Sequence, residues 1–128
     1  MTCDLLLGID VGTSSAKVVL CEPSARVVAR ADVRYRTPGW REQAPDDWWD
    51  AIATGTRQAL SSAGAAGDRV AALALSTQGG TLVPVDGSGV PTRPAILWSD
   101  SRCTAERALV ARELGEQAGL RQYRDVGW

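Results

Sequence analysis

The feature that most constrains the fold is a pair of short apolar runs joined by a small polar turn near the start of the chain. Residues 5–9 are apolar, Asp10 follows them, residues 12–15 are Gly, Thr, Ser and Ser, and residues 18–20 are apolar again. This pattern predicts a β-hairpin. The turn's N–H and hydroxyl groups could hold phosphate oxygens, and Asp10 could hold magnesium. Asp10 could equally cap an ordinary turn, since all these residue types are common in turns.

Composition limits the class of protein. The chain has 128 residues, 45% of them hydrophobic, and a net charge of −1, which suits one globular domain. No apolar stretch reaches the length of a membrane span, and we expect no signal peptide. The near-zero charge argues against a nucleic-acid surface. Histidine is absent, which excludes histidine acid–base catalysis. Cys3, Cys21 and Cys103 are typical of thiols in a reducing compartment, so we expect a cytoplasmic protein.

Residues 26–62 predict a third strand and then a helix. Residues 26–35 are rich in β-branched side chains and would complete an antiparallel meander. Pro45, followed by two aspartates, indicates a helix start, and the helix should end near residue 62. Its expected apolar stripe is Trp48, Ile52 and residues 59–60. Three tryptophans in this region are expected to fix the helix and the preceding loop to the sheet, namely Trp40, Trp48 and Trp49.

The second half of the chain begins with a run of small apolar residues. Residues 69–77 predict a strand that is buried on both faces and lies parallel in the sheet, with Gln78, Gly79 and Gly80 at its carboxyl end, where ligands gather. Residues 81–85 and 95–98 predict two further short strands separated by a turn. A last helix should cover about residues 104–118, with Gly119 closing it and no clear element after it.

Four segments together resemble a known family. Residues 5–20 resemble the first phosphate-binding hairpin of the actin, Hsp70 and sugar-kinase superfamily. Residues 39–49 (Gly-Trp-x-Glu-Gln-x-Pro-x-x-Trp-Trp), the Gln-Gly-Gly of 78–80 and the Trp-x-Asp-x-Arg of 98–102 resemble, in order and spacing, the FGGY carbohydrate kinases. The resemblance implies an α/β chain with the actin-like ATPase, ribonuclease H-like fold, here as a partial N-terminal domain with a mixed sheet and flanking helices.

The resemblance also implies roles around the hairpin. Asp10 would help to hold Mg²⁺ and orient the transferred phosphate, with ATP as the phosphate donor. Gly12, Thr13, Ser14 and Ser15 would form the turn under the nucleotide phosphates. Lys17 falls where family members often carry a cation near those phosphates, and its alternative is a solvated strand residue.

On the sugar side, the resemblance implies substrate contacts by Gln78, Gly79, Gly80, Asp100 and Arg102. Asp100 and Arg102 could instead form an ion pair that fixes the strand–helix junction, which we favour for Arg102. The loop of residues 40–43 could border the same site. Where glycerol kinases have Arg-Glu after the matching Gln, and xylulokinases Met-His, this chain has two glycines. Neither glycerol nor xylulose can therefore be assigned as the substrate.

Family enzymes are several times longer than this chain. The resemblance implies that residues 1–128 are the N-terminal part of the sugar-binding domain and that the C-terminal ATP-binding domain is absent. The full-length enzyme would phosphorylate a sugar or polyol hydroxyl, and it could form a homodimer. Residues 1–128 by themselves should be catalytically inactive. The alternatives are an inactive relic or phosphate-binding fragment of the same fold, and an RNase H-like nuclease. The nuclease is disfavoured because the strand ending at residues 77–78 carries no acid.

Overall fold

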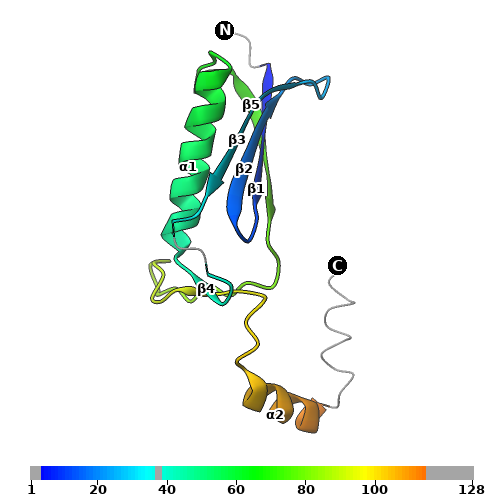
Figure 1. Ribbon diagram of the computed structural model, residues 1–128, viewed down its shortest axis with the longest axis vertical. Helices are drawn as coiled ribbons and strands as arrows, with labels where there is room; N and C mark the ends of the chain where they lie inside the picture. The colour runs from blue at the N-terminus through cyan, green and yellow to red at the C-terminus, as the bar shows by residue number, and fades with distance from the viewer. Residues whose placement is uncertain (1–3, 37–38, 115–128) are drawn as a thin grey trace.

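The computed structural model describes residues 4–36 and 39–114. Its centre is a four-stranded mixed sheet in the order β3-β2-β1-β5, with one long helix, α1, packed on one face (Figure 1). The strands are β1 (Leu5–Val11), β2 (Ser15–Cys21), β3 (Val27–Arg34) and β5 (Val70–Thr77).

The first three strands form the predicted antiparallel meander. β1 pairs with β2 so that Leu7 lies opposite Leu20 and Asp10 opposite Lys17. Alternate residues of β1 and β2 are buried on the face that α1 covers, because side chains of a strand point to opposite faces in turn. The core lies between this face and the helix, and its members from β1 and β2 are Leu5, Leu7, Ile9, Val11, Ala16, Val18 and Leu20.

Helix α1 (Pro45–Ser62) begins at the predicted proline, with Asp46 and Asp47 in its first turn. Its buried face centres on small residues, namely Ala51, Gly55 and Ala59, of which only Ala59 belongs to the expected stripe. Small side chains let the helix approach β2 closely: a Cβ built on Gly55 would lie 2.9 Å from Val18 Cγ2. Of the expected stripe, Trp48, Ile52 and Leu60 are only partly buried.

The expectation that all three tryptophans fix the helix and loop to the sheet is wrong. Trp48 packs against the core, whereas the side chains of Trp40 and Trp49 are 56% and 71% exposed. Trp49 follows Trp48 directly, so helical geometry turns it about 100° away from the core-facing side. One aromatic anchor of the three therefore serves the core.

Strand β5 follows a short 3-10 turn, η1 (Gly67–Arg69). It lies parallel in the sheet, as predicted, and pairs with β1 at one edge. The expected burial on both faces is wrong, because Leu73 and Leu75 are 55% and 61% exposed. α1 lies over β2 and β3 and reaches only the near side of β1, so no described element covers β5 (Figure 1). The apolar composition of β5 is thus on the surface.

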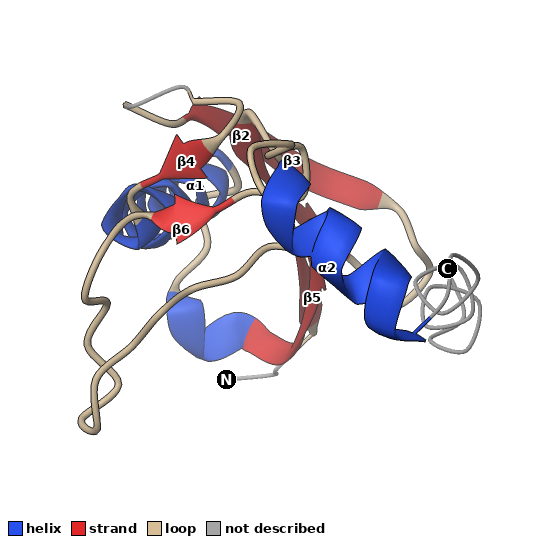
Figure 2. Ribbon diagram, turned by 90° about the horizontal axis from the view of Figure 1, so that it is seen from below, coloured by secondary structure: helices blue, strands red, loops and turns tan. Residues whose placement is uncertain are grey.

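A second, two-stranded sheet lies near the turn end of the main sheet (Figures 1 and 2). β4 (Glu42–Gln43) pairs with β6 (Ala95–Ile96), so the short strand predicted for residues 95–98 is present but ends at Ile96. The strand predicted for residues 81–85 is wrong: only isolated bridges occur there, Leu82 with Ile96 and Val85 with Pro91. Helix α2 (Thr104–Leu114) starts as predicted and lies apart from the sheet, and the expected elements beyond 114 fall outside the described residues.

Among the helices in the described ranges, none has the length and apolar character that a membrane crossing requires.

Candidate functional site

The candidate site is built on the β1–β2 turn. β1 ends at Val11 and β2 begins at Ser15, and the Gly12 N–H donates to the Ser15 carbonyl at 3.1 Å, which closes the turn. Ser15 is buried, whereas Ser14 is exposed at the tip. Within residues 4–36 and 39–114, the N–H groups of Thr13 and Ser14 donate to no protein acceptor. The turn therefore offers two free backbone donors.

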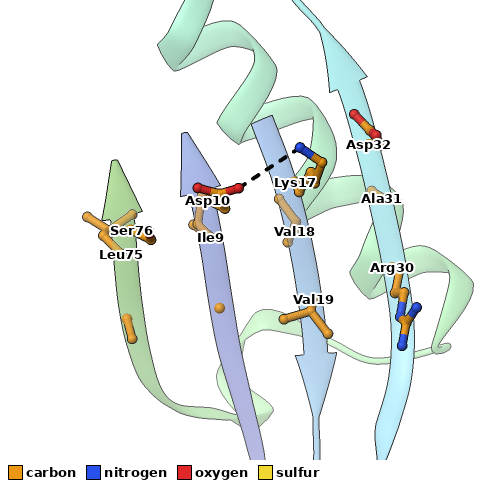
Figure 3. Close-up of a pocket in the computed structure, with 12 residues that line it drawn as sticks. Ile9, Asp10, Lys17, Val18, Val19, Arg30, Ala31, Asp32, Leu75 and Ser76 are labelled. Carbon is orange, nitrogen blue, oxygen red and sulfur yellow. Dashed lines mark ion pairs between the residues drawn. The ribbon is translucent and has the colours of Figure 1, made fainter. Parts of the chain in front are cut away.

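Asp10 and Lys17 lie beside this turn on the sheet face opposite α1. Their Oδ2 and Nζ atoms are 4.0 Å apart, and both side chains are more than half exposed. They lie at one end of an open groove of about 830 Å³ that spans all four strands, with Val19, Arg30 and Asp32 along its floor and side (Figure 3). Water screens an exposed pair at this distance, so both charges remain available to a ligand.

Two buried side chains contact the turn from the interior: Tyr35, for which the sequence indicated no role, and Gln43, which belongs to the loop expected to border the sugar site. The Tyr35 hydroxyl donates to the Gly12 carbonyl at 2.8 Å, and Gln43 Nε2 donates to the Thr13 carbonyl at 2.6 Å. Gln43 is 2% exposed and accepts a hydrogen bond from Trp48 Nε1 at 2.7 Å. Gln43 thus contacts the turn of residues 12–15 directly. Its place in the Trp-rich segment was the only signal for it.

A third contact joins the turn to one of the segments expected on the sugar side. Trp98 Nε1 donates to Thr13 Oγ1 at 3.2 Å. Gly80 has a φ of +67°, and a Cβ at that position would lie 3.3 Å from Trp98 Cβ, so the two backbones approach closely. The structure therefore brings Gly80 next to Trp98, and Trp98 next to Thr13 of the turn.

Gln78 adds an unusual feature at the end of β5. Its backbone N–H donates to the Val11 carbonyl at 2.9 Å, which ties it to the turn end of β1. Its side-chain oxygen and nitrogen are buried and have no hydrogen-bond partner among the described residues, and the same holds for the Thr81 hydroxyl. A buried polar atom without a partner is costly, so a bound polar group is the natural complement for this amide.

Asp100 and Arg102 form an ion pair, and Arg102 extends it to a third charge. Arg102 Nε lies 2.9 Å from Asp100 Oδ2, and its Nη2 lies 2.6 Å from Glu42 Oε1. The hydrogen bonds from Arg102, from its side chain first and its backbone next, lower the pKa of Asp100 to about 2. The same guanidinium lowers the pKa of Glu42. Arg102 is therefore held between two carboxylates, β4 supplying one and the Trp-x-Asp-x-Arg segment the other.

The donor set fits a nucleotide phosphate with its magnesium. The turn supplies neutral N–H and hydroxyl donors for phosphate oxygens, and Asp10 supplies a hard carboxylate oxygen. Among the described residues no group of three or more His, Cys, Asp or Glu side chains could hold a metal by itself. Magnesium commonly binds through one or two carboxylates, phosphates and retained water, so one carboxylate is sufficient here.

A mixed sheet of this order, with a polar turn at its end, is that of an actin-like, ribonuclease H-like domain, and the likeness to solved kinase structures given below confirms this expected fold class. The chain belongs to the FGGY family of carbohydrate kinases and matches the model of the family's N-terminal domain over residues 5–125.

The similar proteins include xylulose kinases and glycerol kinases. A xylulose kinase of Staphylococcus epidermidis is 31% identical over 121 residues, which cover 91% of this chain and 24% of that protein. A glycerol kinase of Rhodospirillum centenum is 35% identical and covers 87% of this chain and 23% of that protein. The crystal structure of a xylulose kinase from Rhodospirillum rubrum superposes with a TM-score of 0.77 at 28% identity, over 89% of this chain and 24% of that one. The chain thus spans about a quarter of these relatives.

Proposed function

We propose that this chain supplies the phosphate-binding turn and part of the sugar side of an ATP-dependent carbohydrate kinase. Residues 1–128 would be the N-terminal part of the sugar-binding domain, working with a longer polypeptide that brings the ATP-binding domain. The observation that carries the proposal is the pair of unpartnered N–H groups at Thr13 and Ser14 beside the Asp10 carboxylate. Family membership supports a phosphotransferase acting on an alcohol group.

ATP with Mg²⁺ would supply the transferable phosphoryl group. Asp10 would hold the magnesium ion, directly or through water, and so fix the position of the phosphates. The turn residues Thr13 and Ser14 would bind phosphate oxygens through N–H and hydroxyl groups, and Lys17 would balance their charge. Phosphoryl transfer depends mainly on such positioning and charge neutralisation, which these residue types can provide.

The acceptor is proposed to be a sugar or polyol hydroxyl held near Gln78, Gly79 and Gly80. The buried, unpartnered amide of Gln78 supports this placement, because hydroxyl groups both donate to and accept from an amide. Arg102 is proposed to orient Asp100 and Glu42 rather than to bind substrate, since both carboxylates already engage its guanidinium. The enzyme would work in the cytoplasm, where ATP and sugar metabolites meet, and the full-length form could be a homodimer.

The test replaces the matching segment of the Staphylococcus epidermidis xylulose kinase with residues 5–125 of this chain. In this chimera, Asp10→Ala should reduce sugar-dependent ADP release about a hundredfold or more, because electrostatic groups at a transferring phosphoryl typically contribute that much. Asp32→Ala is the matched control, because Asp32 is another carboxylate lining the same groove, in register with Lys17. A folded, active chimera that loses only a few-fold in rate with Asp10→Ala would contradict the role.

A further inference from the structure

We infer that Tyr35 and Gln43 are positioning residues that hold the Thr13–Ser14 turn with its N–H groups turned outward for an anion. The inference rests on the proposed phosphate-binding function of this turn and adds the device that orients it. Neither side chain would touch the anion. Both act on the backbone that does, from the buried side of the turn.

The argument starts from the direction of two carbonyl groups. The Gly12 carbonyl accepts from the Tyr35 hydroxyl at 2.8 Å, and the Thr13 carbonyl accepts from Gln43 Nε2 at 2.6 Å. In a planar trans peptide the carbonyl and the following N–H point in opposite directions. Holding these two carbonyls toward the interior therefore turns the N–H groups of Thr13 and Ser14 away from it.

The donor atoms are themselves fixed. Gln43 is held at three points: its Nε2 donates to the Thr13 carbonyl and, at 3.2 Å, to the Gly39 carbonyl, while its Oε1 accepts from Trp48 Nε1. An indole N–H can only donate, so it must face the amide oxygen. This leaves the NH₂ group facing the two carbonyls, and the amide cannot be reversed without breaking all three hydrogen bonds.

Tyr35 is fixed in a comparable way. Its side chain is 5% exposed, and its backbone N–H donates to the Ser14 carbonyl at 3.3 Å. Burial, with the nearby Asp10 charge, raises the pKa of the hydroxyl to about 12, so it remains a donor throughout the physiological range. Three successive carbonyls of the turn, at residues 12, 13 and 14, are thus held by Tyr35 and Gln43.

The test measures tripolyphosphate binding by ¹⁵N NMR in the 128-residue chain, because NMR can follow millimolar affinities residue by residue. In the wild type, the Thr13 and Ser14 amide resonances should shift on titration. Tyr35→Phe and Gln43→Leu should each weaken binding by roughly fivefold, the effect of one hydrogen bond that no longer holds the turn. Gly55→Ala is the control, because it disturbs the α1–β2 contact and leaves the turn untouched.

The outcomes separate this inference from the proposed function. Wild-type affinity in folded Tyr35→Phe and Gln43→Leu variants would overturn the positioning role and leave the phosphate role standing. Absence of any wild-type shift at the turn would contradict the phosphate role itself. Amide hydrogen exchange in the wild type tests the orientation of the Thr13 and Ser14 N–H groups without any variant. If these groups face outward, they should exchange at nearly unprotected rates. Strong protection of both amides would overturn the inference, even if the variants fail to fold.

Discussion

The Tyr35 hydroxyl has to stay protonated to donate to the Gly12 carbonyl, and its ionisation gives a pH-dependent prediction at the level of one residue. Its pKa in the folded chain is about 12, against 10.0 for an ordinary tyrosine. The unfolded chain therefore loses this proton first as pH rises. The contribution to stability is complete below pH 10 and is lost as pH rises from 10 to 12.

We expect the wild type to lose about 1–2 kcal/mol of unfolding free energy between pH 9 and pH 11.5, beyond any loss in Tyr35→Phe. Urea denaturation at both pH values measures the difference. The Tyr35→Phe variant is the control for the wild type, because every other group that titrates between these pH values is present in both proteins. Equal losses in the two proteins would show that Tyr35 titrates alike in the folded and unfolded chain.

At the level of secondary-structure elements, the contact between α1 and β2 depends on Gly55. Alanine in place of a helical glycine usually gains about 1 kcal/mol in helix propensity. Here the added Cβ would lie 2.9 Å from Cγ2 of Val18, a buried, β-branched side chain that cannot easily move. We expect overpacking to win, so that Gly55→Ala destabilises the chain by about 1 kcal/mol in thermal or urea unfolding.

A double-mutant cycle makes this prediction specific to the α1–β2 contact. Val18→Ala removes the methyl groups that the new Cβ would meet, so Gly55→Ala should be neutral or stabilising in that background. A destabilising effect of Gly55→Ala that is the same in both backgrounds would mean that the helix does not approach β2 through this position.

The hydrophobic pattern of the sequence predicted the helices and strands better than it predicted which of their faces are buried. The apolar runs of residues 5–9 and 18–20 specify the hairpin locally, and Pro45 marks the start of α1, so both followed from the sequence. The exposure of Leu73 and Leu75 did not follow from the sequence. A continuous apolar run indicates a strand suited to burial, but it does not show whether another element packs on that strand. For the site, the turn was recognisable from its residue types. The support from Gln43 was not, because it depends on a contact across 30 residues.

For the whole molecule, the two edges of the sheet differ in charge. β5 carries no charged residue over its eight positions, whereas β3, the other edge, carries Arg30, Asp32 and Arg34. Charged side chains protect an edge strand from pairing with another chain, and an apolar edge without them invites it. We therefore expect the 128-residue chain to have a tendency to self-associate through β5.

Sedimentation velocity or light scattering measures this association. Leu75→Lys, which places a charge on the β5 edge, should shift the chain toward monomer. Val27→Lys is the matched control, since Val27 is an exposed apolar residue on the β3 edge. A monodisperse wild-type monomer would contradict the association, and equal effects of the two substitutions would contradict its assignment to β5.

The β1–β2 turn is far in sequence from Tyr35 and Gln43, and this separation affects the order of events in folding. The hairpin is continuous in sequence and can close within about 1–10 μs. Tyr35 lies 23 residues beyond Gly12, and Gln43 lies 30 beyond Thr13. The turn can therefore form before these two side chains have made the hydrogen bonds that orient it. Ribosomes add about 5–20 residues per second, so for a second or more a nascent chain would have the hairpin turn without the hydrogen bonds from Tyr35 and Gln43. Recognition of an anion would then be acquired late in folding, when residues 35–48 reach the sheet.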